Sequence, residues 1–254
     1  MFSVLDMFTI GVGPSSSHTV GPMCAAQAFA SSLEESGAVS RVGRIRVVLY
    51  GSLSLTGLGH GTDRAILAGL EGNVPATVDT DYLLSVRERC AHDGTIHVNG
   101  TNAIAYDDDG DMVFDRWKRL APHPNGMRFQ AFDAQGNIID EQVWYSIGGG
   151  FIRRGRIDDA LISNHEQTPA SSQSPEDSGN DETAEYGDGV PYPFVSCDGL
   201  IDLCRKHHLS IADVVWANET ARRSPQEVRD RLTRIWNVMS HCIDACLLYT
   251  SPSP

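Results

Sequence analysis

One segment near the middle of the chain contains almost no apolar residues, and it limits how the rest can fold. Residues 164–190 consist mostly of Ser, Glu, Asp, Pro and Gly. Such a composition cannot bury enough apolar surface to offset the entropy lost on ordering. We therefore expect a flexible acidic linker here, with a folded part on each side of it.

The residues before this linker, 1–163, mix strand and helix signals. Arg44–Tyr50 is rich in β-branched residues, which is typical of a strand. Two pairs of short runs, around Asn99–Gly100 and around Gln135–Asn137, predict β-hairpins. Apolar residues at helical spacing predict three helices, over Val20–Leu33, Asp63–Leu70 and Tyr82–Cys90. The pattern predicts an α+β domain with a mostly antiparallel or mixed sheet.

The residues after the linker show a helical pattern. Ser224 is the expected N-cap of a long helix, with Pro225 at its first position and Glu227 three residues after the cap. We expect residues 191–245 to form the start of an all-α domain. Residues 246–254 match the translation of a transposase sequencing adapter and are interpreted as an artefact. A natural tail rich in Pro and Ser is the alternative.

The charge of the chain narrows the range of partners. Its 254 residues include 20 Lys and Arg against 33 Asp and Glu, a net charge of −13. Such a surface repels phosphate backbones and anionic lipids, so we expect neither nucleic acid nor a membrane as partner. The N-terminus lacks the basic region of a secretory signal, which favours a cytoplasmic location. The six cysteines show no C-x-x-C spacing, and we assign no metal ligand among them.

A loop rich in Gly and Ser, residues 11–22, precedes the first predicted helix. The free N–H groups at a helix start favour an anion, such as a substrate carboxylate or a phosphate. Ser15, Ser16 and Ser17 add hydroxyl donors, and His18 adds a ring that titrates near neutral pH. A plain serine-capped helix without a ligand is the alternative at this point.

A second loop with several glycines, residues 56–64, follows the predicted strand. His60 lies between two glycines, so its neighbours offer its ring little packing, and this favours a functional role. Thr62 or Asp63 can cap the following helix. Asp63 can instead orient a nearby imidazole.

A third histidine, His123, lies between two prolines. Asn125, two residues later, offers both amide donors and an acceptor. A turn into a hairpin with an incidental histidine is an equally good interpretation of this motif. A fourth motif, Ser146–Phe151, ends a predicted strand with three glycines and indicates a hinge or a close backbone approach. Composition and spacing together predict a small-anion site lined by two or three histidines.

The four motifs SSSHTVGPM, GHGTDRAILAGL, HPNGM and SIGGGF, in this order, resemble the β domain of the bacterial L-serine dehydratases that use a [4Fe–4S] cluster. The resemblance covers about residues 1–160 and 191–245. It implies deamination of L-serine to pyruvate and ammonia without pyridoxal phosphate, with an iron atom of the cluster as Lewis acid. It also implies a β domain similar to the allosteric substrate-binding domain, the start of a catalytic α domain, and a homodimer in the full-length form.

The resemblance also implies roles for individual residues. His18, His60 and His123 match the family's active-site histidines, and His60 is the expected base for the α-proton. Four further residues are expected to bind the carboxylate or the amino group: Ser16, Ser17, Thr62 and Asn125. The family's cluster cysteines lie beyond the point where this chain stops, and none of the six cysteines here matches them. We therefore expect the chain alone to be inactive.

Two other interpretations remain open. The first is a binding module that senses a small carboxylate, because the β domain resembles the allosteric substrate-binding domain of some phosphoglycerate dehydrogenases. The second is a β subunit that works with a separate α chain. The helical segment after Pro193 argues against both.

Overall fold

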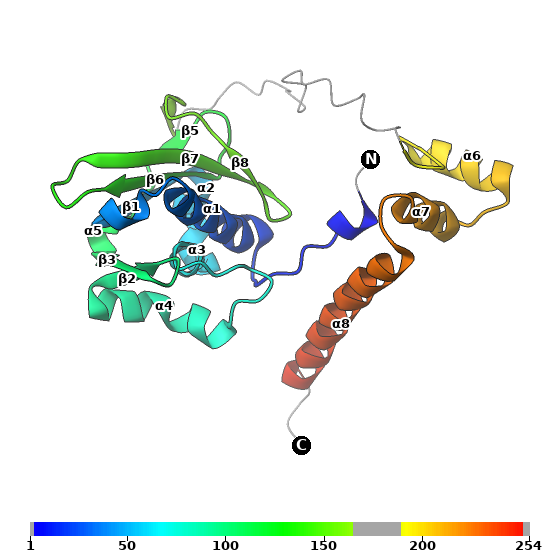
Figure 1. The fold of residues 1–254 in the computed structure, drawn as a ribbon, viewed down its shortest axis with the longest axis horizontal. Helices are drawn as coiled ribbons and strands as arrows, with labels where there is room; N and C mark the ends of the chain where they lie inside the picture. Colours follow the sequence, from blue (N-terminus) through cyan, green and yellow to red (C-terminus); the bar gives the residue numbers. More distant parts are fainter. Residues whose placement is uncertain (1–2, 165–188, 251–254) are drawn as a thin grey trace. The chain divides into compact units, whose positions relative to one another are not determined.

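The computed structural model describes residues 3–164 and 189–250, which fall into two compact units (Figure 1). One unit contains the described residues from Gly11 onward up to residue 164. The other combines residues 3–10 with residues 189–250. The predicted acidic linker lies almost entirely outside the described residues, as do the last four residues of the predicted adapter.

The larger unit is built on a mixed sheet, which confirms the predicted α+β class. Strand β1 (Arg44–Tyr50) has the predicted bounds and lies inside the sheet order β2-β3-β1-β6-β7-β8. It pairs in parallel with β3 and β4 and antiparallel with β6, while the pairs β2–β3, β6–β7 and β7–β8 are antiparallel. The other strands are β2 (Thr95–Val98), β3 (Asn102–Ala105), β4 (Met112–Asp115), β6 (Gly126–Phe132), β7 (Ile138–Gly148) and β8 (Phe151–Arg154).

Three helices cover one face of this sheet (Figure 1). They are α1 (Gly21–Glu35), α3 (Thr62–Leu70) and α4 (Thr80–Asp93), close to the predicted stretches. Alternate residues of β1, among them Ile45 and Leu49, point into the core between sheet and helices. Phe29 of α1 stacks there on Phe129 of β6, with ring centroids 5.2 Å apart. The core therefore follows the apolar patterns of helix and strand.

The opposite face of the sheet carries a smaller apolar cluster. Tyr50 and Tyr145 of the large sheet pack there with Leu120. Leu120 belongs to a small second sheet made of β5 (Lys118–Leu120) and β9 (Leu161–Ser163).

Several short elements connect these strands and helices. Two of them lie between β1 and α3: helix α2 (Gly51–Thr56) and the 3-10 turn η4 (Gly57–His60). The others are the π-helical turn η2 (Ser16–Val20), the 3-10 turn η3 (Val39–Arg41) and helix α5 (Asp108–Asp111).

The second unit is helical. Its helices are α6 (Cys197–His207), α7 (Ile211–Thr220) and α8 (Pro225–Thr250). Ser210 caps α7 in a complete capping box with Asp213. At the start of α8 the backbone N–H of Glu227 donates to Ser224 Oγ, as the sequence predicts. Among the described residues, no helix combines the length and the apolar composition needed to cross a membrane.

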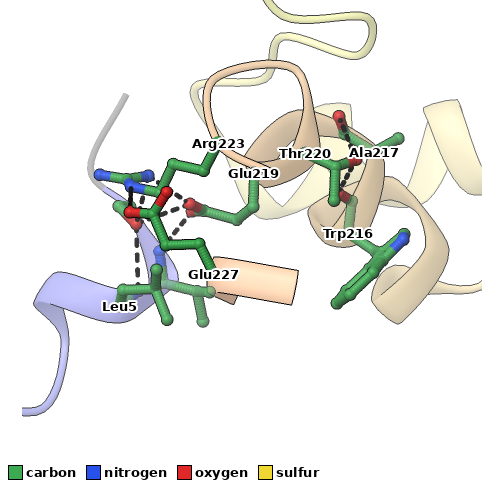
Figure 2. A network of polar contacts seen from close by, with 9 residues as sticks. Leu5, Trp216, Ala217, Glu219, Thr220, Arg223 and Glu227 are labelled. Atoms are coloured by element: carbon green, nitrogen blue, oxygen red, sulfur yellow. Dashed lines mark hydrogen bonds and ion pairs between the residues drawn. The ribbon is translucent and has the colours of Figure 1, made fainter. Parts of the chain in front are cut away.

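The first described residues of the chain are part of this helical unit. They form the 3-10 turn η1 (Val4–Asp6), which lies against α7 and α8. The Ser3 hydroxyl and the Val4 N–H each donate to the Glu219 carboxylate at 2.8 Å, and Arg223 donates to the same carboxylate at 2.8 Å (Figure 2). Glu219 is buried, so these three donors supply the partners that its charge requires.

Candidate active site

The serine-rich loop enters helix α1 through the π-helical turn η2. Ser15 caps this turn, because its Oγ accepts the backbone N–H of His18 at 3.2 Å. Ser17 Oγ lies 2.9 Å from Nδ1 of the half-buried His18 ring. Ser16 is exposed at the first position of the turn. Two of the three serines therefore hold the backbone and the ring of His18.

Two hydrogen bonds join the serine-rich loop to the loop of His60. Thr19 Oγ1 donates to the His60 carbonyl at 2.9 Å. Thr62 Oγ1 donates to the His18 carbonyl at 2.5 Å. The rings of His18 and His60 consequently lie with their centroids 5.0 Å apart and their planes inclined by 44°. The structure thus brings two of the three predicted histidines together, and it uses the hydroxyl of Thr62 to do so.

The hydrogen bond of His60 determines which ring nitrogen carries its proton. Nδ1 lies 2.9 Å from the backbone carbonyl oxygen of Thr56. A carbonyl oxygen only accepts, so Nδ1 of the neutral ring must carry the hydrogen. Nε2 then holds a lone pair, which is the form that a general base needs.

His123 takes the opposite tautomer. The backbone N–H of Asn125 donates to His123 Nδ1 at 3.1 Å, so this nitrogen holds the lone pair. The proton of the neutral ring is therefore on Nε2, where it can be donated. The ring also lies beside the ring of Tyr145, with centroids 6.1 Å apart.

The fourth motif contacts both the first and the third. The side-chain amide of Asn125 donates to the Ser146 carbonyl at 3.2 Å, and the Ser146 N–H donates to the Asn125 carbonyl at 3.1 Å. The Ser146 side chain is buried against Gly21, the first residue of α1. A Cβ atom at Gly21 would lie 2.1 Å from Ser146 Oγ, so the glycine allows α1 to approach β7.

Helix α2, for which the sequence predicted only a short connection, joins the three histidine loops. Ser52 Oγ lies 3.0 Å from His18 Nε2. The backbone N–H of Ser52 donates at 2.9 Å to the carbonyl of Pro124, next to His123. The carbonyl of Thr56, at the end of the same helix, accepts the ring N–H of His60. Ser52 is therefore a site residue that sequence reasoning missed.

Gly51 is the one local sequence signal for the contact between helix α2 and the loop of His123. In the sequence it marks only the end of a strand. Its φ of 56° is in the left-handed region that favours glycine. A Cβ atom at this position would also lie 2.2 Å from the carbonyl oxygen of Pro124. The close contact between α2 and the third loop therefore depends on this glycine.

His18 and His123 have lowered pKa values. Burial lowers the pKa of His18 below its usual value, and the neighbouring His60 lowers it further. Burial also lowers the pKa of His123, and the positive charge of Arg153 acts in the same direction. The neutral form of both rings therefore predominates at pH 7.

Comparisons with known proteins identify the family of the chain. The family model described as serine dehydratase beta chain matches residues 3–156. The chain belongs to the serine dehydratase beta chain family. An L-serine dehydratase of Streptomyces coelicolor is 41% identical over 242 residues, which are 95% of this chain and 49% of that protein. L-serine dehydratase 1 of Escherichia coli is 38% identical over 248 residues, 96% of this chain and 49% of that protein. The chain thus spans about half the length of the curated relatives it matches.

The serine dehydratase resemblance implies a [4Fe–4S] cluster, and the cysteines of this chain do not provide a site for it. Within residues 3–164 and 189–250, no three His, Cys, Asp or Glu side chains gather so that they could hold a metal ion. Cys90 of α4 is buried in the core, and Cys24 and Cys204 are partly buried. Cys197, Cys242 and Cys246 are exposed on α6 and α8. The described residues therefore do not fit a cluster.

Proposed function

We propose that this chain supplies the substrate-handling part of an L-serine dehydratase, the enzyme that converts L-serine to pyruvate and ammonia. The observation that carries the proposal is the pairing of His18 with His60, in which the Nε2 lone pair of His60 is available as a base. The names of the relatives support L-serine as the substrate.

Binding of the substrate carboxylate is assigned to the start of the helix that follows the serine-rich loop. The dipole of a helix favours a negative charge at its N-terminal end. Ser16, exposed at the first position of the π-helical turn, and Ser17 add hydroxyl donors. Asn125 and Thr62 contribute by holding the loops in place, because their side chains already bond to the backbone of Ser146 and His18.

His60 is the proposed base for the α-proton of serine. Its Nδ1–H is held by the Thr56 carbonyl, so Nε2 can accept the proton and the ring becomes an imidazolium. The β-hydroxyl leaves as hydroxide and takes up one proton to become water, while the imidazolium of His60 releases the α-proton to solvent. The net products of this step are aminoacrylate and water. Aminoacrylate tautomerises to the imine, which water hydrolyses to pyruvate and ammonia.

His123 is the proposed hydrogen-bond donor to an oxygen atom of the substrate. Because the backbone N–H of Asn125 donates to Nδ1, the proton of the neutral His123 ring is on Nε2. Its lowered pKa keeps the ring neutral near pH 7, so that this hydrogen bond does not depend on a charged imidazolium.

The remaining parts of the proposal concern the whole enzyme. We propose that residues outside this chain hold the [4Fe–4S] cluster, since the described cysteines do not gather. It follows that this chain binds L-serine but does not turn it over. We further expect a homodimeric enzyme of the cytoplasm in the full-length form.

Calorimetric titration of this chain with L-serine tests the binding step. We expect L-serine to bind and D-serine, which places its α-proton on the other face, to bind less well. Absence of L-serine binding contradicts the proposed function. Anaerobic reconstitution with iron and sulfide, followed by a pyruvate assay, tests the second step, and turnover by this chain alone refutes our assignment of the cluster to residues outside it.

A further inference from the structure

The imidazole of His18 is held on both sides by hydroxyl groups. Ser17 Oγ lies 2.9 Å from Nδ1, and Ser52 Oγ lies 3.0 Å from Nε2. Ser17 is the neighbour of His18 in the chain and moves with the same loop. Ser52 belongs to helix α2, outside the loop of His18. Of the two hydroxyl groups, only that of Ser52 therefore ties the His18 ring to another part of the site.

Helix α2 gives Ser52 a rigid position. Leu53, the next residue, is completely buried in the core. The Thr56 hydroxyl donates to the Ser52 carbonyl at 3.0 Å, and the Ser52 N–H donates to the Pro124 carbonyl at 2.9 Å. A side chain supported in this way can hold a partner in one orientation at little further entropic cost.

We infer that Ser52 is a positioning residue, whose hydroxyl fixes the orientation of the His18 ring and thereby the place of the His60 ring beside it. The catalytic consequence rests on the proposed function, whereas the hydrogen bond to His18 does not. Ser52 acts through His18 and is not itself assigned a contact with substrate.

Loss of the Ser52 hydroxyl should change the state of the His18 ring. Without this hydroxyl, Nε2 loses the side-chain partner that lies 3.0 Å away, whereas Ser17 remains beside Nδ1. Removal of one hydrogen bond between neutral groups lowers the population of the bonded ring orientation about fivefold relative to other orientations. Nitrogen NMR reports this change, because the chemical shift of an imidazole nitrogen depends on its hydrogen bonding.

Ser54 provides a matched control in the same helix. Ser54 is buried, whereas Ser52 is half-buried, and the Ser54 hydroxyl donates to the carbonyl of Gly51 at 2.8 Å. A Ser54→Ala change therefore removes a hydroxyl of the same kind from the same helix without removing a partner of His18. Ser52→Cys keeps a side chain of nearly the same shape with a weaker donor, and serves if Ser52→Ala does not fold.

The test is nitrogen NMR of the histidine rings in the whole chain, with His18 assigned from a His18→Gln variant. We expect Ser52→Ala to shift the His18 Nε2 resonance, Ser52→Cys to shift it less, and Ser54→Ala to leave it as in the parent chain. A folded Ser52→Ala or Ser52→Cys variant with unchanged His18 nitrogen shifts overturns the inference. Addition of L-serine to the same samples tests the proposed function separately: failure of L-serine to alter any spectrum contradicts that function and leaves the Ser52 result intact.

Discussion

Replacing Glu219 by Gln tests how the first residues of the chain are held on the helical unit. The carboxylate accepts from Ser3 and Arg223 on one oxygen and from Val4 on the other, each at 2.8 Å. An amide has one acceptor oxygen, so in either orientation its NH2 group faces at least one of these donors. A hydrogen bond to a charged group contributes about 1 kcal/mol more than one to a neutral group, so three such bonds lose about 3 kcal/mol.

Hydrogen exchange of the Val4 amide measures this loss. About 3 kcal/mol corresponds to exchange more than about a hundredfold faster, or to exchange at the unprotected rate. Glu227→Gln is the matched control, since Glu227 is half exposed and lies 3.9 Å from Arg223, a pair that contributes about 0.5 kcal/mol. Equal Val4 exchange rates in Glu219→Gln and Glu227→Gln would refute the reasoning.

Three further predictions concern the larger unit. Gly51→Ala should destabilise it by about 2–3 kcal/mol in urea unfolding, because the new Cβ meets the Pro124 carbonyl at a left-handed φ. Asp108→Asn should lower the melting temperature at pH 7, because three hydrogen bonds from Arg87 hold the pKa of the Asp108 carboxyl below its ordinary 3.8 in the folded state. The stability that this carboxylate contributes is present above pH 3.8 and is lost as the pH falls through the folded pKa. The His123 ring should titrate with a midpoint below 6.5 in NMR, because burial lowers its pKa.

Each of these predictions has a control and a contrary outcome. Gly59→Ala should be tolerated, because a Cβ there has nothing within 4 Å, and equal destabilisation by both glycine variants would argue against the contact with the Pro124 carbonyl. A melting-temperature difference for Asp108→Asn that grows on acidification contradicts its depressed pKa. A His123 midpoint at or above 6.5 would contradict a buried, neutral ring.

Local sequence signals predicted the elements that depend on local interactions, such as a helix cap, or that show a clear pattern of apolar residues. The β-branched run Arg44–Tyr50 is strand β1 with the same bounds, and Ser224 accepts the N–H of Glu227 at the start of its helix as predicted. Helix α2 could not be found in this way. It has only six residues, Gly51–Thr56, and the N–H of Ser52 in its first turn bonds to the distant Pro124 carbonyl, so its formation depends on tertiary contact.

The same difference between local signals and tertiary contacts applies to the candidate site. Glycines and prolines around His18, His60 and His123 indicated functional loops, and the roles of these residues remain predictions. Their arrangement could not be predicted, because it depends on the pairing of β1 with β6 and on helix α2 between the loops. The tautomers of His60 and His123 depend on single backbone hydrogen bonds, which no residue pattern records.

Exchange of the α-proton of L-serine in deuterated water tests the central claim most directly. Residues 1–245 of this chain would be joined to the second half of the Streptomyces coelicolor relative, and compared with the same protein carrying His60→Ala or, as control, His92→Ala at an exposed position. We predict exchange and pyruvate formation in the parent and the His92 variant, and loss of both in the His60 variant. Retained exchange in His60→Ala would contradict the assignment of His60 as the base.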